Sequence, residues 1–103
     1  MFAIMEEQKI DINLTDEVAQ GHYSNLTIIT HSDNEFVMDF VQMMPGVNKG
    51  QVRSRVIMTP KNAKRLLRAL TENLGSYEKK MGVIDEGPAP QGFPPLTGGQ
   101  GLA

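Results

Sequence analysis

Four basic side chains lie close together in one eight-residue stretch, and they are the strongest sign of chemistry in the sequence. They are Lys61, Lys64, Arg65 and Arg68. Ammonium and guanidinium groups bind phosphates and carboxylates, so this spacing predicts a surface for an anionic partner, nucleic acid above all. A helix is expected to begin just before these residues, and its positive dipole end disfavours basic side chains. A helix selected only for stability would carry acidic residues there.

Two further arginines, Arg53 and Arg55, precede this helix on an expected strand, on the sheet face away from the helix. Residues 40–71 hold seven bases and no acid, whereas residues 1–39 hold eight acids and one base. The basic block 49–68 therefore has two interpretations. It binds nucleic acid or another polyanion, or it pairs with the acidic N-terminal region within one chain or across a dimer. No aromatic residue lies among the bases to stack on nucleobases.

The other reactive residue types form no catalytic or metal-binding pattern. His31 is expected at a hairpin end beside Asp33 and Glu35, where an imidazole could bind a metal or act as a base, but a solvated turn histidine is the simpler interpretation. The chain has no cysteine, which excludes disulfides, thiolate metal sites and thiol nucleophiles. "PGVNKG" lacks the spacing of a phosphate-binding loop. We expect no enzymatic activity, no catalytic residues, no metal and no cofactor.

Four β-strands are expected upstream of the basic helix. Apolar and polar residues alternate in "KIDINL" (residues 9–14), which is typical of a half-buried strand. Residues 23–45 are typical of a hairpin, and residues 51–58 form a further strand after the "PGVNKG" turn. Between the first strand and the hairpin, Thr15 can cap a short helical turn that ends near Gly21.

The alternation of side chains also predicts how the strands pair. A three-residue loop, Ser32–Asn34, places Leu26 opposite Phe40, and a two-residue loop is not expected. In the next strand pair, Asp39 is expected opposite Arg55. Opposite charges that face each other across strands stabilise a sheet modestly.

A long α-helix is expected after the last strand. Thr59 is a good N-cap, Pro60 suits the first helical position, and Gly82 is a natural stop. Apolar residues recur at spacings of four and three and form one stripe: Ala63, Leu67, Leu70, Leu74, Tyr77 and Met81. The helix is longer than a sheet of short strands requires, so its end beyond Leu74 is expected to contact another surface.

Apolar residues left on the second sheet face predict a homodimer. One helix covers only one face of a sheet, and a chain with roughly eighty structured residues buries only ~60% of its unfolded surface. The expected interface comprises Ile29, Val37, Val41, Ile57, Leu74, Tyr77 and Met81.

The expected fold class is α+β, with an antiparallel sheet of about four strands (β-β-β-β-α) and one long C-terminal helix on one face. Residues 1–86 form a single domain. Residues 87–103 hold four prolines and five glycines and are expected to be disordered. The N-terminus lacks the basic region of a signal peptide, and no apolar run approaches the ~20 residues that span a bilayer. We therefore expect a cytoplasmic protein without membrane contact.

Three segments resemble domain-of-unknown-function family 3467, a group of small bacterial proteins. They are "GHYSNLTIITHSDNEFVMDF", "MMPGVNKGQVRSRVIMTPKNAKRLLRAL" and "ENLGSYEKKMG". The resemblance extends from about Glu17 to Gly82 and implies a bacterial source. The family has no assigned activity, so the resemblance implies no catalytic residue.

The expected function is that of a small non-catalytic interaction or assembly module, working as a homodimer. The alternative is a nucleic-acid-binding protein that uses the basic block 49–68. The two interpretations differ in what surrounds the four helical bases. Acidic side chains from residues 1–39 would cover them in the first case and leave them open in the second.

Overall fold

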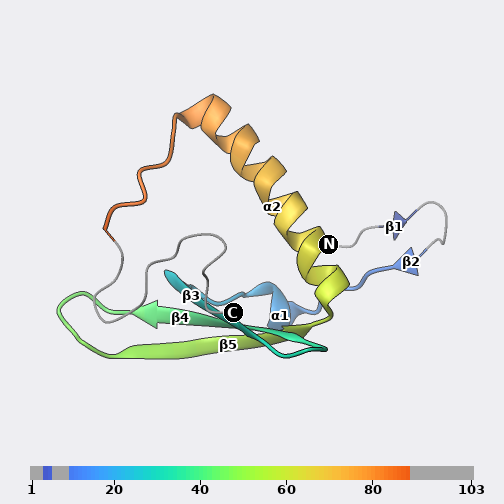
Figure 1. Ribbon diagram of the computed structural model, residues 1–103, viewed down its shortest axis with the longest axis horizontal. Helices are drawn as coiled ribbons and strands as arrows, with labels where there is room; N and C mark the ends of the chain where they lie inside the picture. Colours follow the sequence, from blue (N-terminus) through green and yellow to red (C-terminus); the bar gives the residue numbers. More distant parts are fainter. Residues whose placement is uncertain (1–3, 6–9, 89–103) are drawn as a thin grey trace.

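The computed structural model describes residues 4–5 and 10–88, in which five strands and two helices are present (Figure 1). They are β1 (Ile4–Met5), β2 (Ile10–Asp11), α1 (Asp16–Ala19), β3 (Leu26–His31), β4 (Phe36–Met43), β5 (Gly50–Met58) and α2 (Pro60–Met81). β3, β4 and β5 form an antiparallel sheet in that order, and β1 pairs with β2 separately. The expected α+β class is confirmed. All of the expected disordered tail except Gly87 and Pro88 lies outside the described residues.

The sheet has three strands in the described part of the chain, so the expectation of about four is not met. The segment 9–14 supplies only β2, which pairs with β1 rather than with the sheet. Ile12 and Leu14 follow as exposed, unpaired residues. Alternation predicts an extended backbone but does not choose its partner. Closing the short connection between Met5 and Ile10 costs less chain entropy than reaching a distant sheet edge.

The expected register of the β3–β4 hairpin is wrong by one residue. Leu26 pairs with Val41 instead of Phe40, and the turn has two central residues, with the Ser32 N–H donating to the Glu35 carbonyl at 2.9 Å. Because a shift of one residue moves side chains to the other face, this changes which residues lie together. Ile29 now lies opposite Met38.

Two polar residues just before β3 explain this register. The Ser24 hydroxyl donates to the Val41 carbonyl at 3.1 Å, and the Asn25 N–H donates to the same carbonyl at 3.0 Å. The Asn25 side chain accepts from the Met43 N–H at 2.8 Å and donates to the Met43 carbonyl at 3.0 Å. Asn25 thus continues the ladder with its side chain and holds β3 in place against β4.

The register of β4 against β5 is confirmed. Asp39 lies opposite Arg55, and a bulge follows between Phe40 and Val41. Beyond the bulge, Val41 is only 4% exposed and packs over Gly50. A Cβ on Gly50 would lie 2.8 Å from the Val41 Cγ1 atom and 2.6 Å from the Met43 Sδ atom, so a side chain at this position has no room.

Local signals explain the start and end of α2. The Thr59 hydroxyl accepts a hydrogen bond from the Asn62 N–H at 3.1 Å, as an N-cap does, and Pro60 occupies the first turn. Gly82 ends the helix with a positive φ of 98°. The expected helix boundaries are therefore confirmed.

The expectation that α2 covers one sheet face is wrong. α2 has no buried residue, and it rises away from the sheet at a steep angle (Figure 1). Only Thr59 separates β5 from α2, and Pro60 restricts the backbone at the start of the helix. The connection is too short to bring the helix back flat across the strands.

The hydrophobic core of the described protomer is consequently very small. Its buried hydrophobic side chains are Leu26, Met38 and Val41, and they all belong to β3 and β4. Each of the long apolar side chains of α2 remains at least 38% exposed. The helix and the sheet are thus held together mainly through the backbone rather than by a shared core.

Candidate functional site

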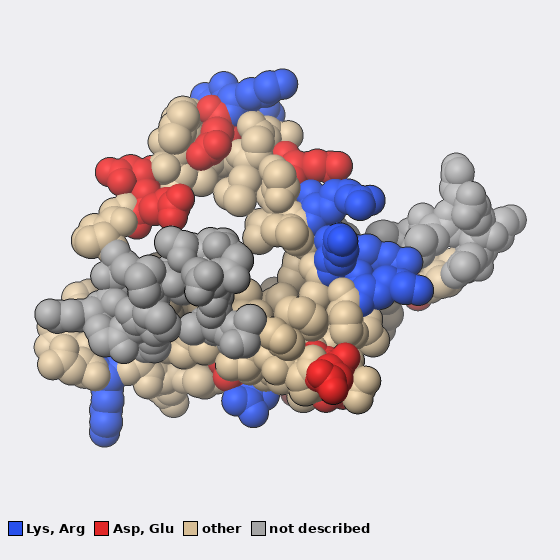
Figure 2. All heavy atoms as spheres, viewed as in Figure 1, with Lys and Arg blue, Asp and Glu red and all other residues tan. Residues whose placement is uncertain are grey.

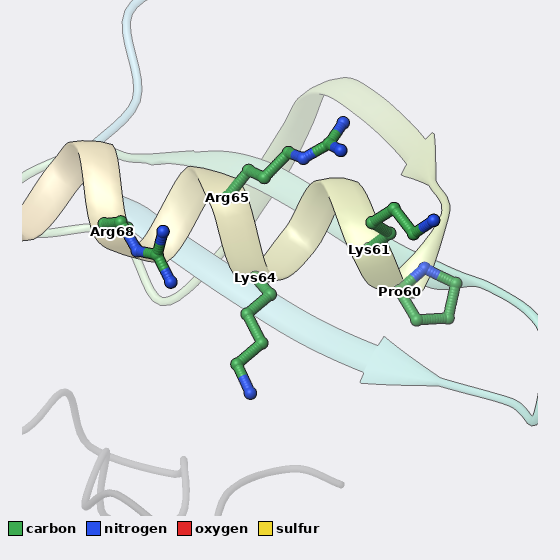
Figure 3. A pocket seen from close by; sticks show the side chains of 5 residues that line it. All are labelled: Pro60, Lys61, Lys64, Arg65 and Arg68. Atoms are coloured by element: carbon green, nitrogen blue, oxygen red, sulfur yellow. The ribbon is translucent and has the colours of Figure 1, made fainter.

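The four helical bases lie around one shallow hollow on the first two turns of α2 (Figure 3). The hollow has a volume of about 430 Å³ and is lined by Pro60, Lys61, Lys64, Arg65 and Arg68. Lys64 and Arg65 project from different sides of the helix in this view. The structure therefore brings the predicted residues together on one helix, with Lys64 set apart from Arg65.

No acidic side chain neutralises these bases within the described part of the chain. The first turn of α2 contains no acid. Within the described residues, the ion pair shorter than 4.0 Å joins Arg55 of β5 to Asp39 of β4 and involves none of these bases. Lys and Arg side chains gather on the outer side of the start of α2 (Figure 2). Within one protomer, the described residues thus leave these bases without an acidic partner, and the expected pairing with residues 1–39, across a dimer or through Glu6 and Glu7 outside the described residues, stays a prediction.

The strand arginines do not join this hollow. Arg55 donates from Nε to the Asp39 Oδ1 atom at 2.6 Å and from Nη2 to Oδ2 at 2.9 Å, a bidentate pair. These hydrogen bonds hold the pKa of Asp39 below its ordinary value, although partial burial of the carboxyl acts in the opposite direction. Arg53 is exposed on β5 and is absent from the lining of the hollow. The predicted strand–helix block is thus divided between two surfaces.

A second candidate surface is the apolar stripe of α2. Leu67 is 63% exposed and Met81 is 70% exposed. Leu70, Leu74 and Tyr77 of the same stripe are also exposed, and Leu66 beside the stripe is 38% exposed. In Figure 2 the flank of α2 nearest the sheet carries mainly uncharged residues.

The sheet residues predicted for a dimer interface do not lie together on one exposed face. Val41 is buried within the protomer and offers no surface to a partner. Val37 and Ile57 are paired neighbours on one face, whereas Ile29 lies with Met38 on the other. Ile57 remains 57% exposed. The sheet therefore keeps apolar surface on both faces.

The histidines do not form a site in the described residues. The His31 ring stacks on Phe36, with ring centroids 5.0 Å apart, and His22 is exposed. Among the described residues there is no group of three or more histidines and acids placed to hold a metal ion. Within the same residues, no helix has the length and apolar character needed to cross a bilayer.

The sequence analysis predicted no role for three residues that the structure shows to be important, Ser24, Asn25 and Gly50. Ser24 and Asn25 fix the hairpin register, and Gly50 makes room for Val41. In the sequence, "YSN" lies within one of the three segments that carry the family resemblance. A serine and an asparagine directly before a strand are residues whose short side chains bond readily to backbone, which is the signal that could have identified their role.

Comparison with known proteins identifies the family. Neither the curated proteins nor the solved structures include a match to this chain. One family model does match, the protein of unknown function DUF3467, over residues 2–86. This range contains the sheet, both candidate surfaces and the whole of α2. The chain therefore belongs to the DUF3467 family.

Proposed function

We propose that this protein is a non-catalytic interaction module of the bacterial cytoplasm that works as a homodimer. One observation supports this most strongly: the described protomer buries only the hydrophobic side chains Leu26, Met38 and Val41. Exposed apolar surface costs roughly 25 cal/mol per Å², and contiguous apolar patches on small proteins usually mark interfaces. A second copy is the one partner that is always present at the same concentration.

The described residues that line the hollow include no carboxylate and no imidazole, and this supports a non-catalytic role. The hollow is lined by Pro60, two lysines and two arginines. General acid–base and nucleophilic chemistry need a carboxylate, an imidazole or an activated nucleophile within hydrogen-bond reach. This set of groups is suited to binding and not to proton transfer.

Sedimentation equilibrium of the full chain tests the proposal. At micromolar concentration we expect twice the chain mass of 11.4 kDa. The melting temperature should rise with protein concentration, because a partner that binds only the folded state stabilises it by mass action. A monomer that unfolds cooperatively at the same temperature at every concentration would refute the homodimer.

A second function, binding of nucleic acid or another polyanion, is favoured by a different observation. The bases of the hollow have no acidic partner within 4.0 Å among the described residues. Each phosphate neutralised releases about one counterion, so four contacts predict an affinity loss of about 100-fold between roughly 50 and 200 mM salt. Fluorescence anisotropy with single-stranded and duplex DNA measures this dependence.

The test variant and its control remove basic side chains from opposite ends of α2. The triple substitution Lys61→Gln, Arg65→Gln and Arg68→Gln should abolish DNA binding. The control, Lys79→Gln with Lys80→Gln, removes charges from the last turn and should leave binding nearly unchanged. If wild-type protein fails to bind DNA at low salt, this second function is wrong, and the homodimer proposal is unaffected.

A further inference from the structure

We infer that the second copy docks through its own α2, antiparallel to the first, in a short coiled-coil seam. This rests on the proposed homodimer and specifies which surfaces meet. The exposed stripe of α2 follows the seven-residue pattern of such seams, with apolar residues spaced by four and three. Its positions are Ala63, Leu67, Leu70, Leu74, Tyr77 and Met81.

The stripe has the exposure that a helix partner requires. From Leu67 to Met81 its side chains are between 43% and 70% exposed, and none of them is used by the core of its own protomer. The stripe from Ala63 to Met81 is about 27 Å long at 1.5 Å per residue, so a second helix can contact it along several turns.

Side-chain size favours an antiparallel orientation. With the two-fold axis passing near Glu72 and Asn73, Ala63 of each helix lies opposite Met81 of the other, so a small side chain meets a long flexible one. Leu67 then lies opposite Tyr77, and Leu70 opposite Leu74. A parallel pair would instead place Ala63 against itself and Tyr77 against itself, which leaves a gap in one layer and crowds another.

Charge complementarity favours the same orientation. Lys64 and Glu78 flank the stripe on the same side, and the antiparallel arrangement places Lys64 of each copy beside Glu78 of the other. Glu78 is half-buried, and its Oε2 atom accepts a hydrogen bond from the Ile84 N–H at 2.9 Å, which orients the carboxylate at the helix end. In a parallel pair, Lys64 would lie beside Thr59 and no opposite charges would meet. The pairing also repays the placement of Lys64 against the dipole of its own helix.

Charge reversal tests the pairing. Lys64→Glu places two carboxylates together at each end of the seam and should raise the dimer dissociation constant by about tenfold. The same change removes a dipole conflict within the helix, so any effect on helix stability would be in the opposite direction. Adding Glu78→Gln, which keeps an acceptor for the Ile84 N–H, should restore most of the affinity. The control Arg65→Glu changes the same charge one residue away, off the seam, and should leave the dissociation constant unchanged.

Cross-linking tests the orientation, because the natural chain has no cysteine to interfere. With a short bismaleimide, Asn73→Cys should cross-link to itself near the two-fold axis. Lys64→Cys alone should not, because the two copies of that residue lie about 24 Å apart along an antiparallel pair. Lys64→Cys mixed with Glu78→Cys should give a cross-linked heterodimer.

The outcomes separate this inference from the homodimer itself. Self-cross-linking of Lys64→Cys would show a parallel pair and overturn the inference. A dimer whose dissociation constant is insensitive to Lys64→Glu, and which none of these variants cross-links, would place the interface elsewhere. A wild-type chain that remains monomeric would overturn both proposals.

Discussion

Truncating Leu70 to alanine should weaken the dimer substantially while leaving α2 helical. Leu70 lies in the middle of the exposed stripe, and alanine is the better helix former. Any loss of association therefore reflects lost contact between copies rather than loss of the helix. Val83→Ala is the matched control, because Val83 is 86% exposed and lies beyond the helix end.

The size of the effect follows from the exposed fraction of the side chain. Fully burying a leucine is worth about 1.5–3 kcal/mol. Leu70 is 51% exposed in the protomer, so burial of the remainder by a partner is worth about 1 kcal/mol. A two-fold dimer loses this twice, about 2 kcal/mol, which corresponds to a rise of about 30-fold in the dissociation constant.

Sedimentation equilibrium over a wide concentration range measures the dissociation constant, and far-ultraviolet circular dichroism at the same concentrations measures helix content. We expect Leu70→Ala to shift the association curve to higher concentration, whereas Val83→Ala should overlay the wild type. If the two variants have equal dissociation constants, the stripe does not form the interface, and the reasoning from its exposure is refuted.

Three further predictions concern stability and are measured by thermal unfolding. Gly50→Ala should lower the melting temperature by about 5 °C, because a Cβ at this position clashes with the buried Val41 side chain. Gly75→Ala should raise it, because this helical position has open space around it, and equal shifts in the two variants would contradict the reasoning. Thr59→Ala removes the N-cap of α2 and should cost about 1 kcal/mol, whereas Thr59→Ser should cost little. Asp39→Asn should lower the melting temperature at pH 7, and this difference should shrink as the pH falls below about 4, because Arg55 holds the pKa of Asp39 low and its stabilising effect is lost on protonation. A pH-independent difference would exclude that ion pair as its cause.

The basic hollow and the apolar stripe of α2 were both predictable from sequence. Charge and apolar spacing along a single helix depend only on helical periodicity, so the sequence predicts that Lys61 and Arg65 lie at the start of α2 and that Leu70 belongs to its apolar stripe, but not that this stripe is left uncovered. The ion pair of Arg55 with Asp39 was also predictable, because it follows from the register of β4 against β5, which the alternation of side chains indicates.

Local interactions explain what the sequence alone determined about this chain. Thr59 caps α2 and Gly82 ends it through bonds that reach only three or four residues, so their effect does not depend on the rest of the fold. The "PGVNKG" turn between β4 and β5 is likewise closed by a short-range bond, from the Val47 N–H to the Met44 carbonyl. Such features are set by residue type and spacing.

Contacts between distant residues decided the rest. The hairpin register depends on bonds from Ser24 and Asn25 to residues 17 and 18 positions away, which no pattern within either strand specifies. The direction of α2 depends on a one-residue connection at Thr59, and this leaves the apolar stripe without cover inside its own protomer. Periodicity determines which residues form a face, whereas only tertiary geometry determines what that face meets.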